Sequence, residues 1–146
     1  MTHPAILETL AAFGEKTLVV DPSGIVDLCF YLKQTEKFIR LSTLTAVDWH
    51  PSEPRFEIVY HLHSIDRNER LRLKCHLPGS DPQIDSVTPV WQGADWYERE
   101  VFDMFGVIFR NHPNLVRILM PLDWEGHPLR KDYPVHGYKY SYPSDK

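Results

Sequence analysis

The chain has 146 residues, of which 42% are hydrophobic and 25% charged, and its formal net charge is −4 at pH 7. This length fits one domain of ordinary size, and the composition is that of a soluble globular protein rather than a disordered or membrane protein. The acidic balance argues against nucleic acid as the main partner, because phosphate neutralisation needs a basic surface. The chain shows neither a signal-peptide pattern nor the ~20 apolar residues of a membrane helix. We therefore expect a cytoplasmic protein, with membrane association only through partners.

The two cysteines, Cys29 and Cys75, lie far apart in apolar-patterned stretches. This placement predicts small buried side chains in a reducing compartment. The absence of a CxxC motif argues against iron–sulfur or zinc ligation by cysteine.

The N-terminal segment predicts a helix, a strand and a second helix. Apolar residues from Ile6 to Phe13 recur at helical spacing and Gly14 follows as a stop, which predicts a helix over residues 6–13. Residues 17–20 form a short β-type run. Asp21 then resembles an N-cap followed by proline, and residues 22–34 predict a helix with Ile25, Leu28 and Leu32 on one face.

The middle of the chain predicts an antiparallel hairpin. Residues 56–63 and 70–77 each alternate apolar and polar side chains on either side of a polar turn at residues 66–69. Such period-two alternation is typical of strands with one wet face. Residues 38–47 predict a third strand, joined to the hairpin through a turn at residues 50–54.

A third helix, which is amphipathic, is predicted over residues 95–105. Asp95 and Glu98 have capping-box spacing, and Gly106 supplies the C-terminal stop. Beyond it, five prolines exclude long helices or strands. They are Pro113, Pro121, Pro128, Pro134 and Pro143.

Together these elements predict an α+β fold. We expect a two-layer domain with a mixed, mostly antiparallel sheet, two or three helices and an extended proline-rich C-terminal arm. The expected boundaries are residues 1–110 for the core domain and 111–146 for the irregular arm. Burial of apolar area at ~25 cal/mol per Å² favours packing this arm on its own domain or on a partner. Its aromatic residues are Trp124, Tyr133, Tyr138, Tyr140 and Tyr142.

Three groups of residues could carry chemistry. His61, His63 and His76 share a predicted sheet face, but the charged residues around them indicate a solvated surface rather than a metal site. The acidic cluster of the helix predicted over residues 95–105 could perform acid–base work, form a solvated face or meet a partner's basic groups. The loop at residues 123–133 could bind an anion through its basic pair, or be a rigid polar loop. No nucleophile with a base and no phosphate-binding loop is present, so these residues indicate a binding module rather than an enzyme.

Two consecutive runs, ADWYEREVFDMFGVIFRNHPNLVRILMP and LDWEGHPLRKDYPV, resemble the signature of the complex I 30 kDa subunit family. The segments LSTLTAVDW, RFEIVYHLHSI and ERLRLKCHLPG are similar to that family's central strands. The resemblance covers residues 41–135. In the family a basic residue or proline usually stands four positions after the histidine that matches His112. Here that position is Val116, followed by Arg117, so one polar contact expected of the family lacks its residue.

The resemblance implies a non-catalytic structural subunit in the peripheral arm of a type-I NADH:quinone oxidoreductase, which couples electron transfer to proton translocation. It implies packing against the quinone-site subunit, near the cluster-bearing subunits, on the cytoplasmic side of the bacterial inner membrane. No cofactor or metal is expected on this chain, since FMN, iron–sulfur clusters and quinone would belong to other subunits. Because the chain ends at Lys146, it resembles the form that is not fused to the quinone-site subunit.

Thirteen residues are expected at the partner interface or in the structural motif. The acidic ones would pair with the basic ones in a polar network that either braces the arm against the helix predicted over residues 95–105 or bridges to the quinone-site subunit. The thirteen are Glu98, Arg99, Glu100, Asp103, His112, Arg117, Asp123, Gly126, His127, Pro128, Arg130, Lys131 and Asp132.

Three alternatives remain open at this point. The chain could be the equivalent subunit of an energy-converting hydrogenase or of a ferredoxin- or F420-linked dehydrogenase. It could be a stand-alone small hydrolase that uses His127, Asp132 and the acidic helix. It could also be an assembly factor that binds the quinone-site subunit transiently.

Overall fold

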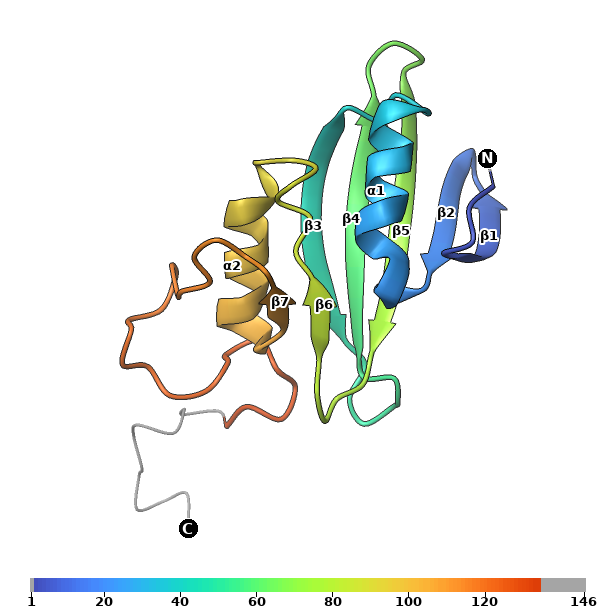
Figure 1. Ribbon diagram of the computed structural model, residues 1–146. Coiled ribbons are helices and arrows are strands. Elements are labelled where there is room, and N and C mark those ends of the chain that lie inside the picture. Colours follow the sequence, from blue (N-terminus) through green and yellow to red (C-terminus); the bar gives the residue numbers. More distant parts are fainter. Residues whose placement is uncertain (1, 135–146) are drawn as a thin grey trace, which may run out of the picture.

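The computed structural model describes residues 2–134, which form a mixed five-stranded sheet flanked by helices (Figure 1). The strand order is β1-β2-β5-β4-β3; β2 and β5 are parallel, and the other neighbours are antiparallel. The α+β architecture predicted from the sequence is thereby confirmed. The strands are β1 (Ile6–Ala12), β2 (Glu15–Val20), β3 (Arg40–Asp48), β4 (Phe56–Ser64) and β5 (Glu69–Leu77).

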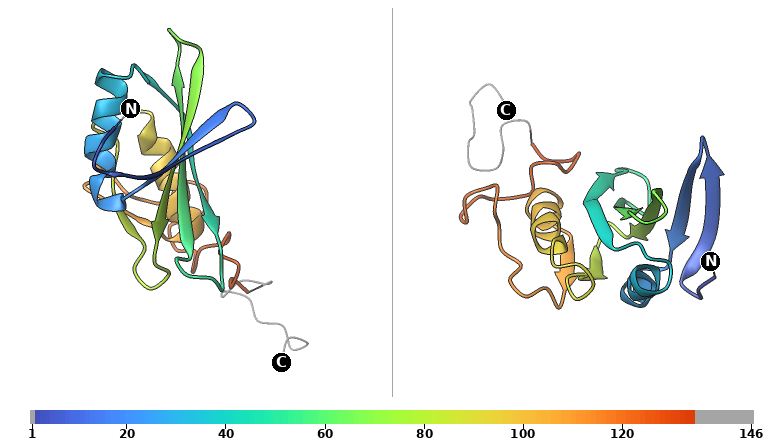
Figure 2. Two further views of the ribbon diagram at one scale, coloured as in Figure 1. Left: turned by 90° about the vertical axis from the view of Figure 1, so that its right-hand side faces the viewer. Right: turned by 90° about the horizontal axis from the view of Figure 1, so that it is seen from above.

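The remaining elements pack around this sheet. In the left view of Figure 2, α1 lies on one side of the β4–β5 hairpin, and Figure 1 places α2 beside β3. Two short parallel strands, β6 and β7, connect the sheet to α2 and to the arm. The sequence did not predict this three-residue pair. The elements are η1 (Pro22–Gly24), α1 (Ile25–Gln34), β6 (Gln83–Asp85), α2 (Ala94–Phe105) and β7 (Ile108–Arg110).

The helix predicted over residues 6–13 is wrong, because Ile6–Ala12 form strand β1 and Phe13 lies in the turn that follows. The chain reverses at Phe13 and Gly14, whose φ angles of 53° and 76° both lie in the left-handed region. Two successive positive φ angles suit a two-residue hairpin turn, and they bring Ala12 opposite Glu15. A helix over these residues would be stabilised mainly by burial of its apolar side chains. In the structure Leu7 and Leu10 are exposed, so burial of these side chains does not set the conformation. Main-chain pairing with β2 therefore decides the conformation.

The start of the first long helix agrees with the sequence. Asp21 lies in the extended region, and its carboxylate accepts a hydrogen bond from the Ser23 N–H at 3.1 Å. Pro22 begins the short η1 turn that leads into α1. Ile25, Leu28 and Leu32 are fully buried, which confirms the predicted apolar face.

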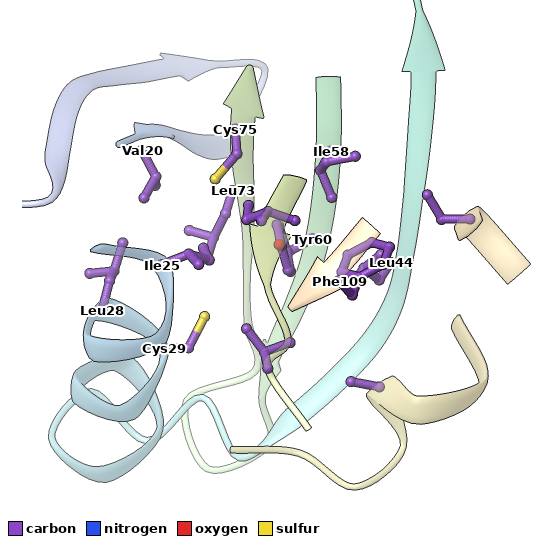
Figure 3. Close-up of a cluster of buried hydrophobic side chains, with 14 of the residues drawn as sticks. Val20, Ile25, Leu28, Cys29, Leu44, Ile58, Tyr60, Leu73, Cys75 and Phe109 are labelled. Carbon is purple, nitrogen blue, oxygen red and sulfur yellow. The ribbon is translucent and has the colours of Figure 1, made fainter. Parts of the chain in front are cut away.

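The core lies between α1 and one face of the sheet, as the close-up in Figure 3 shows. The predicted hairpin is confirmed, with Tyr60 of β4 opposite Leu73 of β5 and Ile58 opposite Cys75. Cys29 and Cys75 are buried and free. Burial raises the pKa of both thiols, so they remain protonated and act as small hydrophobic residues.

The opposite face of the sheet is wet only in part, which corrects the simple alternation. Val59 and Glu57 are buried on this face. The Glu57 carboxylate accepts a hydrogen bond from Trp49 Nε1 at 3.1 Å and lies 3.5 Å from Lys74 Nζ. Long side chains can thus cover parts of a sheet face that would otherwise be solvated.

The described part of the C-terminal arm runs along α2 in Figure 1. Residues 111–134 contain no helix or strand, as the prolines predict. Tyr138, Tyr140, Tyr142 and Pro143 lie outside the described residues, as does the expected end of the arm. The boundary at residue 110 stays a prediction. None of the helices in residues 2–134 is long and apolar enough to cross a membrane.

Candidate functional site

Helix α2 carries the charged motif, and its first acidic residue on the inner face is Glu98. The predicted capping box is wrong: the N-cap is Gly93, which has no side chain to cap the helix. Glu98 instead points inward and is fully buried. Its carboxylate accepts hydrogen bonds from Ser86 Oγ at 2.6 Å and from the Val87 N–H at 2.8 Å. Glu98 therefore attaches α2 to the segment that follows β6. Burial raises the pKa of this carboxyl to about 7.

His112 joins the beginning of the arm to the first turn of α2. Its side chain is fully buried, and Nδ1 accepts a hydrogen bond from the Asn114 N–H at 2.9 Å. An N–H can donate only to an unprotonated ring nitrogen, so the neutral imidazole carries its proton on Nε2. Nε2 lies 3.0 Å from Asp95 Oδ1, 3.3 Å from the Asp95 carbonyl oxygen and 3.9 Å from Glu98 Oε1.

Asp103 is the centre of the contact between α2 and the arm. It is fully buried, and Oδ2 accepts hydrogen bonds from three consecutive N–H groups: Ile118 at 3.1 Å, Leu119 at 2.7 Å and Met120 at 2.9 Å. Oδ1 accepts a hydrogen bond from Arg117 Nη1 at 3.0 Å. Successive backbone N–H groups of this kind form an anion-binding concavity. The carboxylate of α2 thus fixes residues 117–120 of the arm.

The C-terminal end of α2 is capped by the arm. Three carbonyl groups in the last turn have no partner within the helix and accept hydrogen bonds from the loop. His127 Nδ1 donates a hydrogen bond to the Asp103 carbonyl at 2.9 Å. The Leu129 N–H donates to the Met104 carbonyl at 3.0 Å. Arg130 Nε donates to the Phe105 carbonyl at 2.5 Å. Burial lowers the pKa of His127, which favours the neutral ring.

Gly106 permits this close approach. It ends α2 at φ 79°, in the left-handed region where glycine is favoured, as the sequence predicts. A Cβ atom at this position would lie 2.7 Å from Arg130 Nη2 and 2.7 Å from His127 Cδ2. The glycine therefore serves both the helix end and the loop that packs on it.

A second attachment ties the arm to the sheet through an ion triad that sequence reasoning missed. Arg55 donates from Nε to Asp48 Oδ1 at 2.8 Å and from Nη2 to Asp132 Oδ1 at 2.8 Å. The Lys131 N–H donates to Asp48 Oδ2 at 2.8 Å. Burial by itself would raise the pKa of Asp48, but the hydrogen bonds from Arg55, Lys131 and His50 outweigh it and lower that pKa. The hydrogen bonds from Arg55 likewise lower the pKa of Asp132.

One sequence signal could have revealed the triad. Asp48 lies two residues after Ala46 on β3, so strand alternation places its carboxylate on the core face. A buried carboxylate requires a cation or several donors. The partner itself could not be identified, because Asp132 lies 77 residues from Arg55 in sequence.

The thirteen expected residues therefore do not form one network: Glu98 binds the segment after β6, and Lys131 and Asp132 take part in the triad at the sheet. Six of them join α2 to the arm within the chain, namely Arg99, Asp103, His112, Arg117, His127 and Arg130. Arg117 pairs with Asp103 and also donates to the Gly126 carbonyl, while Arg99 Nε donates to the Val116 carbonyl at 3.3 Å. Glu100 and the Lys131 side chain form no ion pair within residues 2–134. The hypothetical polar network thus exists as an Asp103–Arg117 pair, with backbone groups as the other partners of Asp103.

The outer surface of the arm is apolar at several points. Leu122 is 81% exposed, Leu129 56% and Leu119 52%, and Trp96 of α2 is 54% exposed. Within residues 2–134, no group of three His, Cys, Asp or Glu residues could hold a metal ion. The arrangement is suited to holding one polypeptide segment against another, with apolar side chains left outward.

Comparison with known proteins gives matches over most of the chain. The family model described as the respiratory-chain NADH dehydrogenase 30 kDa subunit matches residues 18–139. An NADH-quinone oxidoreductase subunit of Citrifermentans bemidjiense is 49% identical over 133 residues, which cover 91% of this chain and 83% of that protein. The corresponding protein of a Roseiflexus species is 47% identical over 133 residues, which cover 90% of this chain and 76% of that protein.

Two solved structures share the fold. A trypsin-resistant fragment of Nqo5 aligns with a TM-score of 0.66 and 28% identity, covering 72% of this chain and 86% of the fragment. A chain in the membrane-bound sulfane sulfur reductase, an archaeal respiratory membrane complex, aligns with a TM-score of 0.80 and 27% identity, covering 98% of this chain and 91% of that one.

Proposed function

The chain belongs to the 30 kDa subunit family of the respiratory-chain NADH dehydrogenase, and we propose that it is a non-catalytic structural subunit of the peripheral arm of an NADH-quinone oxidoreductase. In this proposal it packs against the quinone-site subunit, close to the cluster-bearing subunits. FMN, iron–sulfur clusters and quinone belong to those other subunits. The complex holds the chain at the cytoplasmic side of the bacterial inner membrane.

The observation that carries the proposal is that the buried carboxylates of α2 bind groups of the chain itself. Asp103 is surrounded by four donors, and Glu98 by a hydroxyl and an N–H, so both carboxylates already serve as structural acceptors. A general acid or base must instead be within hydrogen-bond reach of a substrate. The family's charged residues therefore support a role in shaping the arm rather than in chemistry.

The role of a structural subunit is to fix geometry. Electron donor and quinone must be held at a set separation on neighbouring subunits, and preorganised positioning supplies much of the rate of such reactions. Stable assemblies of this kind bury roughly 2,000 Å² or more at an interface. The exposed Leu119, Leu122 and Leu129 of the arm support docking of this type.

The test compares two adjacent basic residues of the loop. Arg130 donates to the Phe105 carbonyl, whereas Lys131 is exposed and only its backbone N–H binds Asp48. We expect Arg130→Ala to lower the amount of assembled complex on a native gel. Lys131→Ala would do so only if its side chain pairs with a neighbouring protein of the complex.

Normal assembly and normal quinone reductase activity in both variants would contradict the proposed role of this loop. Recovery of the wild-type chain outside the complex, with hydrolase activity of its own, would contradict the structural role altogether. An assembly factor would be absent from the mature complex, whereas a structural subunit is present at a fixed stoichiometry.

A second candidate is favoured by one observation. The alignment with the sulfane sulfur reductase chain covers 98% of this chain at a TM-score of 0.80. The same fold thus occurs in a respiratory complex with a different electron-accepting reaction. The second candidate is therefore the equivalent subunit of a related redox complex, such as a hydrogenase or a ferredoxin- or F420-linked dehydrogenase. Identification of the proteins that co-purify with the chain distinguishes these assemblies.

A further inference from the structure

The five-stranded sheet has two edges, and within residues 2–134 only one of them is covered. At one edge, α2 lies beside β3, and the Tyr97 hydroxyl donates a hydrogen bond to the Ser42 carbonyl at 3.0 Å. At the other edge, β1 pairs with β2 alone, and six of its seven residues are exposed. The left view of Figure 2 shows the β1–β2 hairpin projecting from the sheet. A free strand edge is a template for pairing with another chain.

The hairpin geometry decides which backbone groups of β1 face outward. The two-residue turn closes on Ala12 and Glu15, which exchange hydrogen bonds across the hairpin. Antiparallel strands alternate between hydrogen-bonded and non-hydrogen-bonded pairs, so the N–H and carbonyl groups of Thr9 and Ala11 point away from β2. These outward groups have no hydrogen-bond partner within residues 2–134. The edge therefore presents a row of free donors and acceptors.

The sequence of β1 lacks the features that usually protect a free edge. Natural edge strands often carry lysine, proline or a bulge that turns the edge away from a partner. The strand ILETLAA contains neither lysine nor proline, and Glu8 is its one charged residue. Its one irregularity lies between Ile6 and Glu8, so residues 8–12 keep a regular register with β2. This stretch is able to accept a further strand.

Phe13, at the tip of the hairpin, is fully exposed in an unfavourable conformation. Its exposed fraction is 104%, the highest among the large hydrophobic residues in the described part of the chain, and its φ is 53°. A turn of this kind favours asparagine or aspartate before glycine, and a bulky side chain at positive φ is uncommon. Phe13 gives the isolated chain neither apolar burial nor favourable backbone geometry. These two features point to a contact with another molecule.

We propose that β1 docks an extended segment of a neighbouring subunit, which adds to the sheet as a sixth strand. The backbone of this segment pairs with the outward groups of Thr9 and Ala11, and an apolar pocket of the same subunit receives Phe13. In this mode of recognition, main-chain hydrogen bonds supply affinity and alternate side chains supply specificity. The inference rests on the proposed function, because it requires a subunit of a complex. It adds a contact surface at the end of the sheet away from α2 and the arm (Figure 1).

The charge of β1 favours a different chain over a second copy as the occupant. Glu8 and Leu10 are exposed on the same face of β1, and Glu8 forms no ion pair within residues 2–134. Two β1 strands paired antiparallel about Thr9, the register that aligns all seven residues, would place each Glu8 opposite a Leu10. A parallel pair would bring two carboxylates together. A segment with a basic residue beside Glu8 and an apolar residue beside Leu10 suits both side chains.

The first experiment changes the tip of the hairpin. Phe13→Asn introduces a side chain that suits the turn, so the melting temperature of the purified chain should stay at or above the wild-type value. The tagged variant and the wild-type chain are expressed together, and their ratio in the purified complex is measured. We expect several-fold lower incorporation of Phe13→Asn. The control is Ile65→Asn, at the exposed turn between β4 and β5, which should be incorporated like the wild type.

Equal incorporation of Phe13→Asn and the wild-type chain would overturn the inference. A clearly lower melting temperature of Phe13→Asn would also overturn it, because the ring would then stabilise the chain's own fold.

The same competition tests the charge. Glu8→Lys would oppose the basic residue of the occupant, so we expect several-fold lower incorporation. Asp66→Lys is the matched control, since Asp66 is exposed and has no ion pair within residues 2–134. Equal loss with both variants would contradict the inference, because incorporation would then follow net charge rather than the edge of the sheet.

The second experiment detects the added strand through the backbone. Hydrogen–deuterium exchange is measured at single amides in the purified chain and in the assembled complex. The outward amides of Thr9 and Ala11 should exchange rapidly in the free chain and at least about tenfold more slowly in the complex. The Leu10 amide faces β2 and should be protected in both states. The Asp66 amide, in the turn between β4 and β5, is the control and should not change.

Unchanged exchange at Thr9 and Ala11 in the complex would overturn the inference, since a partner that contacts only side chains forms no sixth strand. Protection of both amides in the free chain at high concentration would also overturn it, because a second copy would then occupy the edge. If the wild-type chain does not co-purify with a complex, the proposed function fails; if it does and the exchange is unchanged, only this inference fails.

Discussion

Asp103 shows how one side chain can order a segment that has no secondary structure. Its four donors come from Arg117 and from the next three backbone N–H groups of the arm. A buried backbone N–H group needs a hydrogen-bond acceptor. In a helix or sheet another backbone carbonyl is the acceptor, whereas a loop has no such regular partner. A carboxylate on a rigid helix provides these partners and fixes the loop in one conformation.

Replacement of Asp103 should therefore be severe. Asp103→Ala would leave the Arg117 charge and three N–H groups unpaired, and we expect a loss of about 3–5 kcal/mol in the free energy of unfolding. Glu100→Ala on the same helix, where the carboxylate has no ion pair in the described residues, is the matched control and should change stability by under ~0.5 kcal/mol. Urea unfolding of the purified chains measures both values. Equal effects of the two substitutions would contradict the assigned role.

Gly106 is a second position at which one residue decides the geometry. Gly106→Ala would place a side chain at φ 79° and its Cβ within 2.7 Å of Arg130 and His127. We expect a loss of at least ~1–2 kcal/mol from the left-handed conformation alone. Gly93→Ala is the control, since a Cβ there would meet nothing within 4 Å. A melting temperature unchanged by Gly106→Ala would contradict the close approach of the loop.

Glu98 makes stability depend on pH near neutrality. Its pKa rises from an ordinary 4.5 to about 7, so the folded state binds the proton more tightly than the unfolded state. The contribution of this group is therefore fully present below pH 4.5 and is lost as the pH rises to 7, by ~3 kcal/mol in total. Glu98→Gln keeps two hydrogen-bonding atoms without the charge. We expect it to flatten the profile of unfolding free energy between pH 4.5 and 7, and an unchanged slope would contradict this assignment.

At the scale of elements, the ion triad links the end of strand β3, the residue just before strand β4 and the arm. Arg55 is bidentate toward Asp48, and the same guanidinium reaches Asp132. A planar group with five donors can serve both carboxylates, whereas an ammonium group cannot match this geometry. The side chain of Asp48 is 2% exposed and that of Asp132 45%, so the two pairs differ in their surroundings.

This difference predicts unequal effects of matched substitutions. Arg55→Lys should lower the free energy of unfolding by about 1.5–3 kcal/mol. Asp48→Asn should be nearly as costly, while Asp132→Asn at the partly exposed site should cost at most ~1 kcal/mol. Chemical denaturation of the three variants checks the order, and a larger effect of Asp132→Asn would reverse the inferred roles.

The same triad gives an acid dependence of the opposite sign to that of Glu98. The pKa values of Asp48 and Asp132 are lowered from an ordinary 3.8, so their contribution is present above pH 3.8 and is lost as the pH falls below it. Wild-type stability should thus decline on the acid side through the triad and on the neutral side through Glu98.

At the scale of the whole molecule, polar contacts hold the arm inside the chain while apolar side chains remain outside. The side chains of Leu119 and Leu122 are 52% and 81% exposed, although Asp103 fixes the backbone of Leu119 and of the next residue, Met120. Exposed leucines on a segment held in one conformation lose little further entropy on docking. This arrangement supports the proposal that the arm contacts partner subunits.

Substitution of the outward leucines should separate folding from assembly. Leu119→Ser with Leu122→Ser should leave the melting temperature of the purified chain nearly unchanged and lower its retention in the complex several-fold. Ile65→Ser, at a turn residue that is 55% exposed, is the control. A large loss of stability, or full retention in the complex, would show that these leucines serve another purpose.

The sequence by itself determined the elements whose signals are local. Strand alternation in residues 56–77, the Asp21 cap, the proline spacing and the glycine stop at Gly106 each follow from the chemistry of a few neighbouring residues, and the structure confirms them. The family motif in residues 94–135 was also visible as a run of letters, and the match of the family model to residues 18–139 confirms it.

Only the tertiary structure decided the rest, because it depends on residues far apart in the chain. The apolar residues from Ile6 to Phe13 have helical spacing, but Ile6–Ala12 pair with β2, since a backbone partner lay within reach. Glu98 has the spacing of a capping box but bonds to Ser86 and Val87, because α2 packs against the segment after β6. Asp48 and Asp132 meet at Arg55 only when β3 and the arm come together. Pairings over such separations are set by packing, which a local sequence pattern does not contain.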